Sequence, residues 1–335
     1  MMKRSLLIVV LFAANANATV WDHALTSPAD EAAKDLYDAK MTEGDAATIT
    51  ATIQSASVRT TQESVRRAEA AYREAAALRP ADGEPYFRIG HLLHQIYFGC
   101  DPFIVRLPTC EPQYATPVQQ AHIVEAWDEF EKRAPLDPRI GEILLKRALL
   151  NTRLVNGTAR DHDHLEAAAR DYQAALDRGD GLSATRGDEQ LLGNLAETYM
   201  MLDRLDDAIA TYLRAVSVGV ARGSTIYGLA VALDRDGAGE QAIRRILEQG
   251  AGGFDTFQKD LLRGSVFFVP RGEEQYYLAL SNEAFGNYGT ARVFWKGFIA
   301  SGVHPEFAPR AREHLERLHK TPVHAEPPPL ELDDQ

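Results

Sequence analysis

The chain has 335 residues, of which 45% are hydrophobic, 25% charged and 8% aromatic, which is the usage of a globular protein rather than of a collagen-like, disordered or many-span membrane protein. Lys and Arg number 36 against 48 Asp and Glu, so the formal charge is −12, and with no local basic patch we expect no nucleic-acid or anionic-membrane partner. Two cysteines are too few for a disulfide framework or a four-thiolate zinc site.

Residues 1–18 are predicted to form a secretory signal peptide. Lys3 and Arg4 precede an apolar stretch, and small residues at positions 16 and 18 form a cleavage pattern. A membrane anchor is the alternative, but asparagines interrupt the uncharged stretch, and a span needs about 20 mostly apolar residues. No cysteine follows the apolar stretch, so we expect no lipid anchor. The sequence therefore predicts a periplasmic or secreted protein, without an integral membrane segment in the mature chain.

Residues 19–61 are expected to form a degenerate helical hairpin. A first helix is predicted over 29–41, beginning after Pro28 and stopping near Gly44, with Asp45 as the cap of the next helix. Proline is common at the first helical position and glycine just past the last one, so these two residues bracket the helix.

An alanine-centred motif recurs along residues 62–318. Its clearest copy is Ala208-x3-Tyr212-x2-Ala215, whose spacing places two small residues and one ring on a single helical face. Further copies begin at Ala68, Ala126, Ala168, Ala242 and Ala291. Each is preceded by a second helical pattern, and the last strong pair of copies is offset by 34 residues. A period of this length is typical of stacked helical hairpins.

This pattern resembles the tetratricopeptide repeat, in which Leu-Gly/Ala-x2-Tyr on a first helix precedes Ala-x3-Tyr-x2-Ala on a second. The match is strong over 192–220 and 226–249, good over 68–93, and degenerate elsewhere, where the motif spacing is longer. The resemblance implies an all-α fold, a right-handed superhelical solenoid of stacked hairpins. A helical repeat of another kind is the alternative. Strand patterns are few, and the best of them, at 265–269, is too isolated to build a sheet.

The C-terminal region reads as a capping helix followed by a tail. A helix is predicted over 307–318, with Arg, Glu and His side chains on its outer face, which suits the open end of a repeat array. Residues 319–335 contain a run of three prolines and several acidic residues. Such a segment cannot pack a core, so we expect it to be disordered.

Cys100 and Cys110 lie in one predicted loop between the two helices of a repeat. In an oxidising envelope, a pair this close in sequence is expected to form a disulfide. Redox catalysis is the alternative, but that chemistry usually uses Cys-x-x-Cys at the start of a helix. We therefore expect a structural bond.

Two histidine clusters have spacings that a metal could use. His91 and His94 lie three positions apart on a predicted helix, and His162 and His164 alternate with aspartates at the start of another. A site needs a third ligand at a fixed distance, and the aspartates can equally cap their helix. We therefore assign no metal ligand and no cofactor.

The resemblance also implies a binding surface, because the first helix of each tetratricopeptide hairpin lines a concave groove. One stripe of residues on each first helix is predicted to face this groove, and the candidates are Phe87, His91, His94, Glu197, Met200, Tyr227, Asp234, Tyr276 and Glu283. The rings among them could instead pack against the next repeat, since exposed and buried rings look alike in sequence. The clamp for a terminal carboxylate that some family members build from Lys and Asn is not supported by these residues.

Motifs of common enzyme classes are absent from the sequence, including Gly-x4-Gly-Lys-Ser/Thr, Gly-x-Ser-x-Gly and His-Glu-x-x-His. We therefore expect a non-enzymatic scaffold or adaptor for protein–protein interactions in the cell envelope. Its partners would be protein or peptide segments, with no small-molecule substrate. The alternative is a periplasmic chaperone or assembly factor that holds extended client polypeptides. A metal-dependent enzyme that uses one of the histidine clusters is a third hypothesis.

Overall fold

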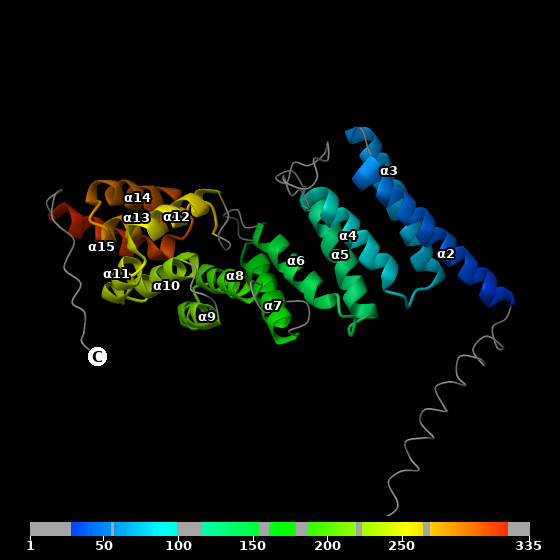
Figure 1. Ribbon diagram of the computed structural model, residues 1–335, viewed down its shortest axis with the longest axis horizontal. Coiled ribbons are helices and arrows are strands. Elements are labelled where there is room, and N and C mark those ends of the chain that lie inside the picture. Colours follow the sequence, from blue (N-terminus) through cyan, green and yellow to red (C-terminus); the bar gives the residue numbers. More distant parts are fainter. Residues whose placement is uncertain are drawn as a thin grey trace, which may run out of the picture. The chain divides into compact units, whose positions relative to one another are not determined.

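The computed structural model describes residues 28–54, 57–98, 116–153, 161–178, 187–218, 223–263 and 269–320, and within these ranges all regular structure is helical (Figure 1). The all-α class expected from the sequence is therefore confirmed. The chain divides into two units, residues 1–137 and 138–335. None of the described helices combines the length and the apolar composition that crossing a bilayer requires.

Several predicted features lie outside the described residues. These are the signal peptide over 1–18, the loop that contains Cys100 and Cys110, and the tail beyond Lys320. The strand pattern at 265–269 is described only at Val269, which is not part of a strand.

The first unit consists of two helical pairs. Helix α2 (Pro28–Ile49), continued by the short π-helix η1 (Thr50–Gln54), packs against α3 (Val58–Leu78), and α4 (Glu84–Phe98) packs against α5 (Pro117–Arg133). Helix α3 also contacts α4, so the two pairs are continuous. Helix α5 begins at a capping box, in which the side chains of Thr116 and Gln119 each accept a hydrogen bond from the other residue's backbone N–H.

The helix predicted to stop near Gly44 continues to Ile49. Gly44 does not end the helix but allows close packing, because a Cβ at this position would lie 2.4 Å from the ring of Tyr72 on α3. The Tyr72 hydroxyl then donates to Asp45, the predicted cap, at 2.7 Å. Helix α2 therefore pairs with α3, which extends from Val58 to Leu78, well beyond the expected boundary at residue 61. The first alanine-centred helix is the second member of the leading pair.

The second unit continues the pairwise arrangement (Figure 1). The pairs are α6 (Ile140–Arg153) with α7 (Asp161–Arg178), α8 (Gly187–Met201) with α9 (Leu205–Val218), α10 (Gly223–Arg235) with α11 (Gly239–Leu247), and α13 (Glu274–Ala284) with α14 (Tyr288–Ser301). Helix α12 (Gly250–Arg263) contacts α10, α11 and α13. A 3-10 turn, η2 (Pro305–Phe307), leads into α15 (Ala308–Lys320), which packs on α14.

The alanine-centred motifs lie on the second helix of each pair, as the sequence predicts. Their first alanines are buried, and the exposed fraction is 0% at Ala68, Ala168, Ala208, Ala242 and Ala291 and 5% at Ala126. The rings between the small residues are buried as well, including Tyr72, Phe130, Tyr172, Tyr212 and Trp295. Small side chains let the paired helix approach, and each ring fills the space that remains. The long interval between the last two motifs is occupied by α12, an additional helix.

Candidate functional site

Three of the predicted groove residues lie on α4 in the first unit and are at least partly accessible. His91 is exposed, whereas Phe87 and His94 are half-buried. The rings of Phe87 and His91 stack with their centroids 5.6 Å apart, and the ring of His94 lies 5.3 Å from that of Trp127 on α5. Helix α4 therefore carries an accessible stripe of one aromatic ring and two imidazoles.

The other six predicted groove residues are buried in the second unit, and they are Glu197, Met200, Tyr227, Asp234, Tyr276 and Glu283. The ring of Tyr227 stacks on Phe257 of α12 with 4.0 Å between centroids. The ring of Tyr276 meets Trp295 of α14 edge-on at 4.6 Å. These side chains are covered by other helices: α12 packs on Tyr227, α15 contacts Asp234 and Glu283, and Tyr212 of α9 and Tyr277 of α13 bond Glu197.

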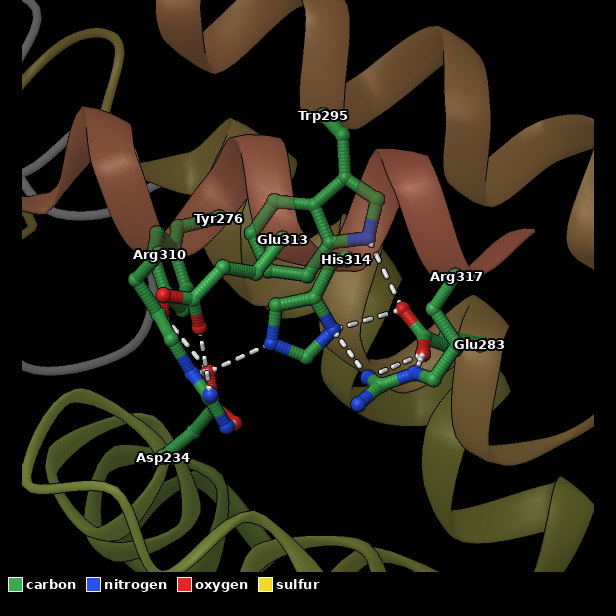
Figure 2. Close-up of polar contacts among 8 residues, drawn as sticks. All are labelled: Asp234, Tyr276, Glu283, Trp295, Arg310, Glu313, His314 and Arg317. Atoms are coloured by element: carbon green, nitrogen blue, oxygen red, sulfur yellow. Dashed lines mark hydrogen bonds and ion pairs between the residues drawn. The ribbon is translucent and has the colours of Figure 1, made fainter. Parts of the chain in front are cut away.

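Three of these buried residues meet around α15. His314 of α15 lies between two carboxylates (Figure 2), with Nε2 2.9 Å from Oδ2 of Asp234 and Nδ1 2.9 Å from Oε2 of Glu283. We term Asp234, Glu283 and His314, together with Arg310 and Arg317 of α15, the C-terminal ion cluster. Its members come from α10, α13 and α15, so the cluster joins the last helix to two first helices.

Asp234, near the end of α10, is fully buried. Besides His314, it accepts hydrogen bonds from the Tyr276 hydroxyl at 2.7 Å and from Nη2 of Arg310 at 2.7 Å. Burial by itself would raise the pKa of Asp234, but the bonds and charges of His314, followed by Arg310 and Tyr276, lower that pKa well below its usual range. The carboxylate is therefore ionised at neutral pH.

Glu283, on α13, is the second acceptor of the cluster. Its carboxylate accepts from the indole Nε1 of Trp295 at 3.0 Å and from Nη2 of Arg317 at 2.6 Å. Burial opposes ionisation here too, yet His314 and Arg317 lower the pKa of Glu283. The Trp295 ring also stacks on His314 with 4.4 Å between centroids, and this contact restricts the orientation of the imidazole (Figure 2).

The charge on His314 follows from these neighbours. Burial disfavours the protonated ring, but the hydrogen bonds to Asp234 and Glu283 outweigh it and raise the pKa of His314. Nη2 of Arg317 lies 2.6 Å from Nδ1 and opposes this charge, although Arg317 is half exposed and its guanidinium also bonds Glu283. The arrangement ties α15 to α10 and α13 through side-chain contacts of His314, Arg310 and Arg317.

Arg235, the neighbour of Asp234, builds a second buried ion pair. Its guanidinium bonds the carboxylate of Glu273 and lies 4.4 Å and 4.3 Å from the ring centroids of Tyr276 and Phe307. Glu273 also faces His304, whose Nδ1 lies 3.0 Å from Oε1. Burial would raise the pKa of Glu273, but the charge of Arg235 and the contact with His304 lower it. Glu273 is therefore a buried, ionised acceptor for two donors.

Glu197, on α8, behaves in the opposite way. The hydroxyls of Tyr212 and Tyr277 both donate to its Oε2, the first at 2.9 Å. Burial, reinforced by the negative charge of Glu273, raises the pKa of Glu197 to about 8. This predicted groove residue therefore holds a proton at neutral pH and contributes no charge to a surface.

The expectation that α15 turns its arginine, glutamate and histidine side chains outward holds for Arg312 and Glu316 but is wrong for His314, which is only 1% exposed. Arg310, His314 and Arg317 follow i, i+4, i+7 spacing, which places them on one face, and this spacing is the signal that could have identified the inner face. Among the side chains that the structure describes, His162 and His164 belong to no group of three potential metal ligands. His162 is exposed, and Nδ1 of His164 lies 3.1 Å from Oδ1 of Asn151.

Comparison of the chain with known protein families and with characterised proteins finds no match.

Proposed function

We propose that the chain is a non-enzymatic scaffold of tetratricopeptide type, exported to the cell envelope, whose helical hairpins bind segments of partner proteins. In this proposal the hairpins follow one another in a right-handed superhelix, as the tetratricopeptide resemblance implies. The observation that carries the proposal is the repeated packing of an alanine-centred helix against the helix before it, in both units. Hairpin arrays of this kind present extended surfaces for partners.

The accessible stripe of α4 is the expected contact site. Phe87, His91 and His94 occupy the predicted groove face and are exposed or half-buried, whereas the other six candidate residues are buried. One aromatic ring beside two imidazoles suits a segment that is partly apolar and not strongly anionic. With a formal charge of −12, the chain should associate fastest with basic segments, and more slowly as salt is added.

The buried carboxylates support a structural role in place of a catalytic one. In the C-terminal ion cluster all four carboxylate oxygens of Asp234 and Glu283 accept bonds from side chains. An acid–base group must be able to exchange its proton with a substrate, and these oxygens are both buried and occupied.

Photo-crosslinking tests the proposal at the level of single positions. A photoreactive residue in place of His91 should capture a partner protein in the envelope, and replacing Phe87 with alanine in that variant should weaken the adduct. Val293, on the second helix α14 and 67% exposed, is the matched control position and should give no such adduct. Equal adducts from both positions, or none from position 91 at several salt concentrations, would contradict the proposal.

Two further outcomes separate the proposal from its alternatives. The mass of the chain isolated from the envelope should show the loss of residues 1–18, and a full-length mass would contradict export by a cleaved signal peptide. Adducts formed only with unfolded clients would instead indicate a chaperone that holds extended polypeptides.

A further inference from the structure

A separate polar group lies where the turn between α8 and α9 meets the segment between α14 and α15. Oδ1 of Asp203 lies 3.0 Å from Nε2 of His304, and Oε2 of Glu306 lies 4.0 Å from the same nitrogen. One ligand atom from each of the three residues lies within 4.8 Å of the other two. Donor atoms that bind one ion at about 2.0–2.2 Å are on the order of 3–4 Å apart, so the two carboxylate oxygens already lie at such a spacing from Nε2 of His304.

His304 is oriented from inside the protein. Its side chain is only 4% exposed, and Nδ1 lies 3.0 Å from Oε1 of Glu273, which is itself paired with Arg235. Histidines that bind metals almost always donate their other ring N–H to a carboxylate or carbonyl, because this contact fixes the tautomer and the direction of the free nitrogen. Here the inner contact directs Nε2 at Asp203 and Glu306. This buried support distinguishes the group from a cluster of surface acids.

The donor set has a chemical preference. Imidazole nitrogen binds Zn²⁺ and other first-row transition ions, whereas Ca²⁺ and Mg²⁺ take oxygen donors. The charges of Asp203 and Glu306 offset those of a divalent ion, and the charge of Glu273 is already offset by Arg235. The side chains of Asp203 and Glu306 are 52% and 53% exposed, so an ion can enter and water can complete its coordination.

We propose that Asp203, His304 and Glu306 form a binding site for a divalent transition-metal ion, with Glu273 as the positioning residue that holds the ring of His304. Coordination uses the lone pair of Nε2, which is available in the tautomer that carries its proton on Nδ1. Because Asp203 and His304 are 101 residues apart in sequence, the ion joins two distant segments of the second unit.

Calorimetric titration of Zn²⁺ into the complete, metal-stripped chain tests this site. The parent chain should bind Zn²⁺, and the double variant D203N/E306Q should bind it at this site at least 100-fold more weakly. Both side chains are exposed, and asparagine tolerates the positive φ of 58° at position 203, so this variant is expected to fold. Circular dichroism checks that fold. Asp206→Asn, an exposed carboxylate on α9, is the matched control and should leave the affinity unchanged.

Glu273→Gln separates positioning from coordination. It should weaken Zn²⁺ binding about 10–100-fold while the number of bound ions stays the same. The visible absorption of Co²⁺ provides a second readout, and D203N/E306Q should abolish the spectrum assigned to this site. The proposal is overturned if the parent binds no Zn²⁺ at micromolar concentrations. It is equally overturned if D203N/E306Q binds as tightly as Asp206→Asn, because the ion is then held elsewhere in the chain.

Discussion

Replacing His314 with glutamine removes the positive charge between Asp234 and Glu283 while it keeps a polar side chain of similar size. Two charge-assisted hydrogen bonds of 2.9 Å are lost, each worth about 1.5–3 kcal/mol. Arg310 and Arg317 still pair with the two carboxylates, which keeps the loss near the lower end of that sum. We therefore expect the substitution to weaken the docking of α15 by about 3 kcal/mol, within the range for breaking a buried ion pair.

The same substitution changes how stability depends on pH. The pKa of His314 is raised in the folded chain, so its contribution is complete below the unfolded pKa of about 6.5 and is lost as pH rises through the folded value. The lowered pKa values of Asp234 and Glu283 act at the acid end, where their contributions are lost as pH falls below about 4 towards the folded values. The parent should hold α15 most firmly between about pH 5 and 6.5, and His314→Gln should lose the alkaline limb of this profile.

Hydrogen exchange of the amides of α15, followed by mass spectrometry, measures this docking without requiring the whole chain to unfold in one step. His319→Gln is the matched control, because His319 is an exposed histidine on the same helix. The amides of α15 in His319→Gln should exchange at the same rate as those in the parent. If His314→Gln exchanges like His319→Gln at pH 6, or if the difference does not shrink as pH rises, the charge that we assign to the imidazole is refuted.

Three further predictions concern packing and a buried proton. Ala208→Leu should overpack α9 and lower the free energy of unfolding by about 1–3 kcal/mol in urea denaturation, and a parent-like midpoint would contradict the helix pairing. Gly90→Ala should lower the free energy of unfolding by a similar amount, because its Cβ would lie 2.4 Å from Trp127. Gly289→Ala, whose Cβ would have nothing within 4 Å, should instead stabilise the chain by up to about 1 kcal/mol. Equal effects of the two substitutions would refute the close approach at Gly90. Because the pKa of Glu197 is raised to about 8, the parent should lose stability as pH rises from about 5 to 8. Glu197→Gln should reduce this dependence of stability on pH. An unchanged dependence would exclude Glu197 as its source.

The alanine-centred helices could be predicted from the sequence because the contacts that define them are local. Ala208, Tyr212 and Ala215 share one helical face by spacing alone, and all three are fully buried. Their partner helix α8 lies just before them in the chain, across a short turn. A pattern of small and large side chains is therefore sufficient to predict the pairing.

The predicted groove depends on distant segments, and local patterns do not contain that information. Asp234 is covered by α15, and its contact with His314 spans 80 residues. A carboxylate on a helix is normally solvated, and it is buried only when a cation from elsewhere in the chain pairs with it and offsets the loss of hydration. The role of Gly44 likewise depends on another helix, since only the ring of Tyr72 on α3 shows that the glycine allows close packing.

The position of α15 is set by ion pairs more than by apolar burial. Its buried apolar side chains are Ala308, Ala311 and Leu318, and the partly buried Leu315 adds to them, so the apolar surface is small and gives little preference for one register over another. The imidazole of His314, in contrast, must meet carboxylates on α10 and α13 at the same time, and hydrogen bonds to charged groups demand defined geometry. A shift of one residue would rotate the imidazole away from both acceptors and leave buried charges without a partner, at a cost of several kcal/mol. The docking of α15 should therefore respond to pH through His314, Asp234 and Glu283, whereas the alanine side chains of the hairpins carry no group that titrates.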